Sequence, residues 1–318
     1  MSKPVCDVWM NESGVYERAL AHAGLADRLE FHGVRADQPI PGDLAARCEV
    51  LVSWRPPPGV LGGMPRLRWV QGSTAGMEHW LGNPDLREQT VLTCARGSHR
   101  VQMPENILGA LFFLTKPLMH CALEQRGSRW VKRVSEPLAG KTLGILGLGA
   151  IGQELARKAA ALEIEVIGTK RRPAPLPHVA KVYAPEATDE VLAASDFVLL
   201  LLPSTGDTEN FMNARRLAAM KKSAWLLNFA RGALIVDADL IAAVKSKTIA
   251  GAVLDVFRKE PLPADHPFWQ TEGIVVLPHI GGGHPQRDIS VAEVFVDNAR
   301  RFLAGEKMAT EVDRGLGY

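Results

Sequence analysis

A glycine-spaced turn in the middle of the chain constrains the fold more than any other feature of the sequence. Gly147, Gly149 and Gly152 form a G-x-G-x-x-G spacing. The turn follows the apolar run 143–146 and opens a helical stretch over 151–162. In such a turn the first glycine permits a tight bend, the second lets backbone approach a pyrophosphate, and the third lets the helix pack on the strand. The segment therefore predicts a β-strand, a dinucleotide-binding turn and a helix whose N-terminus favours negative charge.

Strand-like and helix-like segments alternate after this turn. Short runs of apolar and β-branched residues are separated by helical patterns, for which Thr188, Asn213 and Asp237 are candidate N-caps. This alternation predicts a parallel sheet with helices on both faces, which is an α/β fold. The expected strands are 143–146, 164–167, 182–183, 197–202, 224–228, 249–256 and 274–277.

The first hundred residues repeat the alternation more weakly and predict a second, smaller α/β domain. A long apolar, helix-favouring stretch over 104–126 leads away from it, and an amphipathic helix over 285–303, with Gly305 at its C-cap, leads back. We therefore expect the smaller domain at 1–101, the dinucleotide-binding domain at 102–284 and a return to the smaller domain at 285–318. The early strand candidates are 5–10, 29–31, 50–53, 67–71 and 91–93, and the apolar stripe of the returning helix is Ile289, Ala292, Phe295, Ala299 and Phe302.

Composition excludes several classes of protein. The 318 residues are 47% hydrophobic and 23% charged, with a net charge of +2, so neither a nucleic acid nor a membrane is an expected partner. No apolar run approaches the roughly 20 residues of a membrane span, and the N-terminus lacks an apolar signal core. The four cysteines are scattered without metal-binding spacing, which predicts free thiols, no metal site and a cytoplasmic location.

The residues about 20 positions after the glycine turn bear on which dinucleotide binds. NAD-binding proteins usually carry an acid there for the ribose 2′-hydroxyl, whereas this chain has Thr169, Lys170, Arg171 and Arg172. Because guanidinium groups bind a 2′-phosphate that a carboxylate would repel, we expect NADP(H) to be preferred, with NAD(H) possible. The alternative is a solvated basic turn before the proline-rich segment 173–177.

Three later segments place Arg231, Glu260 and His279 at the ends of predicted strands, where open α/β sheets bind ligands. They read Asn-Phe-Ala-Arg-Gly at 228–232, Leu-Asp-Val-Phe-Arg-Lys-Glu-Pro-Leu at 254–262 and Leu-Pro-His-Ile-Gly-Gly at 277–282. With these motifs in this order, the sequence resembles the D-isomer-specific 2-hydroxyacid dehydrogenase family over nearly its whole length. The resemblance implies a Rossmann domain inserted in a smaller flavodoxin-like domain, with an active site in the cleft between them.

The resemblance also implies roles for individual residues. His279 is the expected proton donor in reduction, Glu260 fixes its tautomer and favours the imidazolium form, and Arg231 binds the substrate carboxylate and polarises the keto group. Ala75 and Gly76 would offer backbone N–H groups to the same carboxylate. Taken singly, an arginine, a glutamate and a histidine in the positions of Arg231, Glu260 and His279 are more often an ion-pair residue, a loop acid and a structural histidine. The expected cofactor-binding residues are Gly147, Gly149, Ala150, Ile151, Gly152, Thr169, Lys170, Arg171, Arg172, Pro203, Ala230 and Asp255.

The segment 52–57 bears on the substrate pocket. Trp54 lies in the segment 52–57, which is similar to the pocket loop of the short glyoxylate/hydroxypyruvate reductases of the family. It could wall a small substrate pocket or simply pack against Pro56 and Pro57. Met103 could also face the pocket, although a core position is the expectation, and His99, His266 and His284 are expected to have surface or packing roles.

These observations together predict an NADPH-dependent reductase of a small 2-keto acid, of glyoxylate or hydroxypyruvate type. The alternatives are a reductase of bulkier or sugar-derived keto acids, and a non-catalytic dinucleotide-sensing binding protein of the same fold. The resemblance implies a homodimer paired through the dinucleotide domain. The apolar stretch 107–114 would belong either to that interface or to the core.

Overall fold

The computed structural model describes residues 3–318, which separate into two compact units. Unit 1 comprises the described residues up to His99 together with His284–Tyr318, and unit 2 comprises Arg100–Gly283. The chain therefore leaves unit 1, completes unit 2 and returns.

Unit 2 is built on a fully parallel sheet. Within residues 100–283, seven strands lie in the order β12-β11-β10-β9-β6-β7-β8, so the order reverses between β6 and β9, where ligands bind in such folds. Helices α4 (Gln102–Thr115) and α6 (Ala150–Ala160) pack on one face. Helices α7 (Thr188–Ala194), α8 (Ala214–Ala218) and α9 (Asp237–Lys245) pack on the other. The strands are β6 (Thr142–Leu146), β7 (Glu165–Thr169), β8 (Lys181–Tyr183), β9 (Phe197–Leu200), β10 (Trp225–Asn228), β11 (Gly251–Leu254) and β12 (Ile274–Val276).

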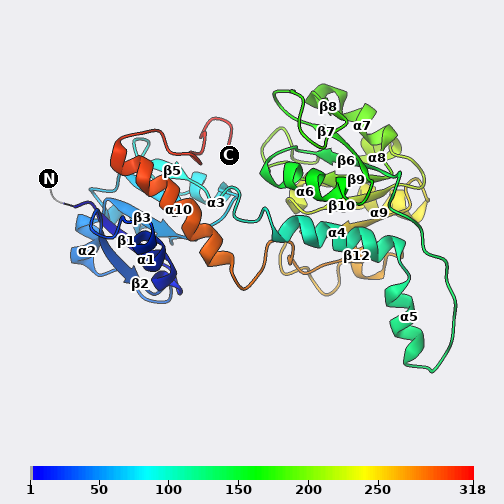
Figure 1. Ribbon diagram of the computed structural model, residues 1–318, viewed down its shortest axis with the longest axis horizontal. Helices are drawn as coiled ribbons and strands as arrows, with labels where there is room; N and C mark the ends of the chain where they lie inside the picture. Colours follow the sequence, from blue (N-terminus) through cyan, green and yellow to red (C-terminus); the bar gives the residue numbers. More distant parts are fainter. Residues whose placement is uncertain (1–2) are drawn as a thin grey trace. The chain divides into compact units, whose positions relative to one another are not determined.

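Unit 1 contains a smaller parallel sheet. Its described residues form five strands in the flavodoxin-like order β2-β1-β3-β4-β5. Helices α1 (Ser13–His22) and α10 (Arg287–Ala304) lie side by side on one face (Figure 1), while α2 (Gly42–Arg47) and α3 (Glu78–Leu81) belong to the rest of the unit. The two strand orders confirm the predicted α/β class, with a Rossmann unit inserted in a flavodoxin-like one. The strands are β1 (Val5–Trp9), β2 (Glu30–Val34), β3 (Val50–Ser53), β4 (Trp69–Gly72) and β5 (Val91–Thr93).

The predicted long helix over 104–126 is wrong as a single element. The chain forms α4 and then α5 (Leu118–Gln125), with a bend of 65° between them. Pro117 explains the break, because proline lacks the N–H that a continuous helix needs and restricts the residue before it. Figure 1 shows α5 and the segment after it extending away from the sheet of unit 2.

Two of the three predicted helix caps are wrong. Asn213 does cap α8, since its side chain accepts the Arg216 N–H at 3.2 Å. Thr188 is instead the first residue of α7, and its hydroxyl donates back to the Pro185 carbonyl at 2.6 Å. Asp237 is the first residue of α9 and makes no cap hydrogen bond, because its carboxylate faces Arg258 and His266.

The returning helix α10 follows most of its predicted pattern. Ala292, Phe295 and Ala299 are buried, and Gly305 ends the helix in the left-handed conformation at φ 72°. Ile289, which was expected in the stripe, is exposed. Position 298 carries a buried Asn that apolar periodicity overlooks, because its amide is satisfied by Gln71 and Thr310.

Other predictions from composition can be compared with the structure. All four cysteines are free thiols, as predicted. Among residues 3–318 no single helix is long and apolar enough to cross a membrane, although α4 and α5 pass that test as a bent pair by length and composition.

Candidate active site

The glycine turn has the shape that a dinucleotide requires. Gly147 has φ 111°, and a Cβ there would lie 2.8 Å from the Leu201 carbonyl oxygen, so only glycine fits beside the end of β9. A Cβ on Gly152 would meet the Gly147 carbonyl oxygen at 2.9 Å, which explains the close helix–strand packing. Nothing lies within 4 Å of a Cβ built on Gly149, the residue before α6.

The N-terminus of α6 supplies donors at this open position. Ala150, Ile151 and Gly152 form its first turn, whose N–H groups have no partner within the helix. Pro203 follows β9, the strand next to β6, and its carbonyl accepts the Thr208 hydroxyl at 2.7 Å. The residues present therefore fit the pyrophosphate of a bound dinucleotide.

The basic segment after β7 divides into anchored and exposed residues. Thr169 is buried, and its carbonyl accepts the Leu148 N–H at 2.9 Å. The Lys170 ammonium lies 3.1 Å from the Leu148 carbonyl oxygen, so it braces the glycine turn. Arg171 and Arg172 are exposed, and no acidic residue stands between positions 168 and 172. This end of the unit is cationic where NAD-binding proteins carry a carboxylate.

Glu260 and His279 form a hydrogen-bonded pair. His279 Nδ1 lies 2.6 Å from Glu260 Oε2, and the other carboxylate oxygen of Glu260 accepts the Phe257 N–H at 2.9 Å. Both oxygens of the carboxylate are thus held. When the Nδ1–H of His279 is donated to Glu260, Nε2 is the ring nitrogen that remains to exchange a proton with a substrate. The His279 side chain is 53% exposed, so a substrate can reach it.

Asp255 holds the loop that carries His279. Its two carboxylate oxygens accept the N–H groups of Ile280 at 2.7 Å and Gly281 at 2.9 Å. His279 itself adopts φ 53°, an uncommon conformation for a residue with a side chain, and its N–H donates to the Asp255 carbonyl at 3.0 Å. Burial raises the pKa of the Asp255 carboxyl, and the Gly281 and Ile280 N–H groups oppose that shift.

Arg231 follows β10 and is held by its own turn. Its carbonyl accepts the Asn228 side-chain amide at 2.9 Å, and its guanidinium donates to the Ala230 carbonyl at 2.7 Å. The next residue, Gly232, packs directly on the segment that leads to Glu260, since a Cβ there would lie 2.0 Å from the Phe257 carbonyl carbon. The structure therefore joins the Arg231 turn to the segment that carries Glu260, which in turn binds His279.

The predicted substrate residues of unit 1 lie after β3 and β4. Trp54 is 61% exposed, so it does not belong to the buried core of unit 1. In the Ser73–Gly76 turn, the N–H groups of Ala75 and Gly76 donate no backbone hydrogen bond within the described residues. Such groups suit an anion.

Sequence reasoning missed several residues that hold these loops. The Trp54 carbonyl accepts the ring N–H of Trp80 at 3.0 Å and lies 2.8 Å from His79 Nε2. Arg287 donates to the Ser73 carbonyl at 2.6 Å. Arg258, inside the 254–262 motif, donates to carbonyls of the segment after Arg231. Only Arg258 stood in a motif that could have drawn attention to it.

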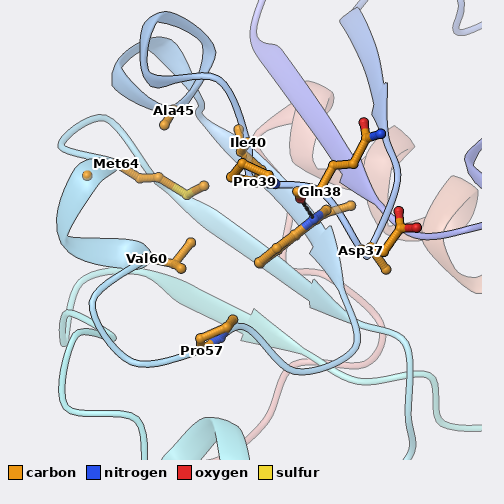
Figure 2. A pocket seen from close by; sticks show the side chains of 11 residues that line it. Asp37, Gln38, Pro39, Ile40, Ala45, Pro57, Val60 and Met64 are labelled. Carbon is orange, nitrogen blue, oxygen red and sulfur yellow. Dashed lines mark hydrogen bonds between the residues drawn. The ribbon is translucent and has the colours of Figure 1, made fainter.

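A cavity of about 450 Å³ in unit 1 is lined mainly by apolar side chains, among them Pro39, Ile40, Val60 and Met64 (Figure 2), and by none of the predicted catalytic residues. Within residues 3–318 no group of His, Cys, Asp or Glu side chains is arranged to hold a metal ion. As expected, Met103 packs against the core of unit 2.

Comparison with known proteins identifies the family of the chain and relatives with the same fold. Residues 108–281 match the family described as D-isomer specific 2-hydroxyacid dehydrogenase, NAD binding domain. The chain is 31% identical to a glyoxylate/hydroxypyruvate reductase A of Serratia proteamaculans, over 93% of this chain and 95% of the relative.

Several solved structures match this chain over its whole length and theirs, and two of them are described here. One is a D-isomer specific 2-hydroxyacid dehydrogenase from Xanthobacter autotrophicus in complex with NADPH and MES, at 30% identity and a TM-score of 0.87. The other is an NADPH-dependent glyoxylate/hydroxypyruvate reductase from Sinorhizobium meliloti in complex with NADP and sulfate, at 27% identity and a TM-score of 0.83.

Proposed function

The chain belongs to the D-isomer specific 2-hydroxyacid dehydrogenase family and is an oxidoreductase with an NAD binding domain. From that premise we propose that it reduces a small 2-keto acid with NADPH. The product is the D-2-hydroxy acid, and glyoxylate and hydroxypyruvate are the proposed substrates. The observation that carries the proposal is the 2.6 Å Glu260–His279 pair on the segment that also packs against the Arg231 turn.

The protein's own residues handle the proton and the negative charges. When bound, the reduced nicotinamide supplies the hydride that forms the new C–H bond. His279 donates its Nε2 proton to the oxygen of the carbonyl as the C=O π bond breaks, and Glu260 holds the ring through Nδ1. Arg231 binds the substrate carboxylate as a planar fork and polarises the keto oxygen.

A keto-acid panel tests this function. Purified protein with NADPH and glyoxylate, hydroxypyruvate, pyruvate or a bulky branched keto acid is followed by absorbance at 340 nm. The proposal predicts the highest kcat/KM for glyoxylate or hydroxypyruvate. Turnover of bulky or sugar-derived acids alone would favour the second reductase class. Tight NADPH binding without turnover of any acid would favour a dinucleotide-sensing binding protein.

Cofactor preference is assigned to Arg171 and Arg172. Both are exposed on a segment without an acidic residue, and the two solved relatives described above hold NADPH or NADP. Replacing both with alanine should raise KM for NADPH about 10-fold or more, because charge-assisted phosphate bonds contribute ~1.5–3 kcal/mol each, while KM for NADH changes less than about twofold. Equal weakening of both cofactors would contradict the assignment.

We also propose that the protein is a homodimer. Ile107 and Leu111 of the predicted interface are buried in the core of unit 2, whereas large apolar side chains further along are exposed. Trp130 is 99% exposed and Val134 90% exposed on the segment after α5, with Leu118 and Leu123 exposed on α5. A second copy would cover this surface. Light scattering should give twice the chain mass of 34.6 kDa, and Trp130→Ser with Leu118→Ser should give monomers.

A further inference from the structure

The segment 256–260 does more than carry Glu260, because Arg258 reaches from it to the chain that follows Arg231. Arg258 Nε donates to the Ile235 carbonyl at 3.1 Å, and its Nη2 donates to the Ala233 carbonyl at 3.2 Å. A guanidinium can bind two carbonyls in one plane, which a lysine cannot. Arg258 therefore joins two loops that come from different strands, β10 and β11.

The surroundings of Arg258 keep its guanidinium in this position. Nη2 also donates to the Asn210 side-chain carbonyl, and Asp237 lies 3.7 Å from Nε. Glu209 adds a second carboxylate, 4.0 Å from Nη1. Burial raises the pKa of Asp237, and Arg258 and His266 oppose that shift. The Arg258 side chain is 34% exposed, so these contacts are partly shielded from water.

One of the carbonyls that Arg258 binds, that of Ala233, lies in the turn that follows Arg231, and the other, that of Ile235, comes directly after this turn. The 3-10 turn Gly232–Leu234 starts directly after Arg231, and the Leu234 N–H donates to the Arg231 carbonyl at 3.3 Å. In the segment 256–260, which also carries Arg258, the Phe257 N–H donates to Glu260, and Glu260 binds His279. Arg258 is thus placed to set the spacing between the Arg231 fork and the Glu260–His279 pair.

We propose that Arg258 is a positioning residue that holds Arg231 in register with the Glu260–His279 pair; this inference rests on the proposed function. Its proposed role requires no contact with substrate or cofactor. Arg258 fixes the backbone of the turn that carries Arg231. Because Arg231 binds the substrate carboxylate, this places the keto group of the substrate in the reactive geometry with His279. Misplacement by about 1 Å can cost an enzyme ~100-fold in rate.

The test compares Arg258→Leu with Lys259→Leu, which removes the neighbouring exposed charge of the same segment. For Arg258→Leu we expect KM for glyoxylate to rise about 10-fold or more and kcat to fall, with the NADPH Kd within about twofold of wild type. Lys259→Leu should match wild type. Arg258→Lys, which keeps the charge and binds one carbonyl at best, should be intermediate and serves if the leucine variant does not fold. Identical kinetics for Arg258→Leu and Lys259→Leu would overturn the proposal.

A double-mutant cycle separates positioning from general support of the fold. If Arg258 acts through the Arg231 fork, Arg258→Leu should have a much smaller effect in an Arg231→Lys background. An equal fold-loss in both backgrounds would mean that Arg258 supports the fold alone, and the proposal would be wrong.

Hydrogen exchange gives a readout that does not depend on turnover. The Leu234 and Ile235 amides should exchange faster in Arg258→Leu than in Lys259→Leu. If wild-type protein reduces no keto acid, the proposed function fails, while this exchange experiment still tests whether Arg258 orders the turn. Unchanged exchange would contradict the inference even in an active enzyme.

Discussion

Each unit of the protein has a buried aspartate on or directly after a strand of its central sheet. The two carboxyl groups differ in their hydrogen bonds. Asp255 of unit 2 is 1% exposed, and each of its carboxylate oxygens accepts a backbone N–H of the His279 loop. Asp7 of unit 1 lies within β1 and is fully buried, and neither oxygen has a hydrogen-bond partner in the described part of the chain. Burial raises the pKa of both carboxyl groups, and for Asp7 the Cys48 thiol and the charges of His32 and Arg47 oppose the shift without cancelling it.

Asp255 therefore holds a loop of the candidate site in place, whereas Asp7 holds no such loop within residues 3–318. An unpaired buried carboxylate weakens the fold, whereas one that accepts two N–H groups fixes a loop that has no regular secondary structure. In unit 2 the Asp255 loop, the Glu260 segment and the Arg231 turn are linked by such contacts. The predicted substrate residues of unit 1, Trp54 and the Ala75–Gly76 turn, instead present an exposed ring and N–H groups suited to an anion.

Among the three variants of acidic side chains, Asp255→Asn should have the largest effect. An amide can accept one of the two N–H groups, but its own NH₂ faces the other, so the His279 loop loses its anchor. We expect kcat for glyoxylate to fall about 100-fold and stability to drop by ~1–3 kcal/mol for the unsatisfied donor. Steady-state kinetics and thermal unfolding measure both, and a variant with wild-type values of each would erase the contrast between the two aspartates.

An intermediate effect is expected for Glu260→Gln. The glutamine keeps an oxygen for His279 Nδ1 but loses the charge, and its NH₂ group faces the Phe257 N–H that Glu260 Oε1 accepts. Because charge-assisted hydrogen bonds are about twice as strong as neutral ones, kcat should fall roughly 10-fold with little change in the NADPH Kd. A wild-type kcat for this variant would show that the acid plays no part in orienting the ring.

The smallest effect on activity, and one of opposite sign on stability, is expected for Asp7→Asn. Because the folded-state pKa of Asp7 is raised, its contribution to stability is complete below the unfolded pKa of about 3.9 and is lost as the pH rises through the folded value. The variant lacks this loss. Its Tm should therefore equal that of wild type near pH 4 and exceed it at pH 7, with activity unchanged. A lower Tm at pH 7 would mean that the buried charge has a compensating partner.

Local sequence patterns predicted those parts of the fold that depend on neighbouring residues. The glycine turn and the αL cap at Gly305 follow from backbone conformations that side chains disfavour. The pattern failed where competing local options existed: Thr188 and Asp237 are as suitable for capping as Asn213, but their side chains bind Pro185, Arg258 and His266 instead. The break at Pro117 was readable in the sequence but outweighed by the surrounding apolar run.

The site was predictable as a set of residues and not as a network. Arg231, Glu260 and His279 stand in recognisable motifs, and the 2.6 Å contact between the last two gives their predicted pairing a geometry. The contacts that hold them come from residues distant in sequence, such as Arg258 with Ala233 and Ile235 or Trp80 with the Trp54 carbonyl. One sequence read alone contains no signal for such pairs, because they arise only when β-strand order brings the loops together.

We propose that His279, held by Glu260, delivers the proton to the keto oxygen. The direct test of this proposal is the rate of NADPH oxidation by His279→Ala at saturating glyoxylate, measured together with the NADPH Kd by fluorescence titration. A proton donor contributes ~10²–10⁴-fold to catalysis, so the rate should fall by about that factor while the Kd stays within about twofold of wild type. A rate close to that of wild type, or a loss of NADPH binding that accounts for the lost rate, would contradict it.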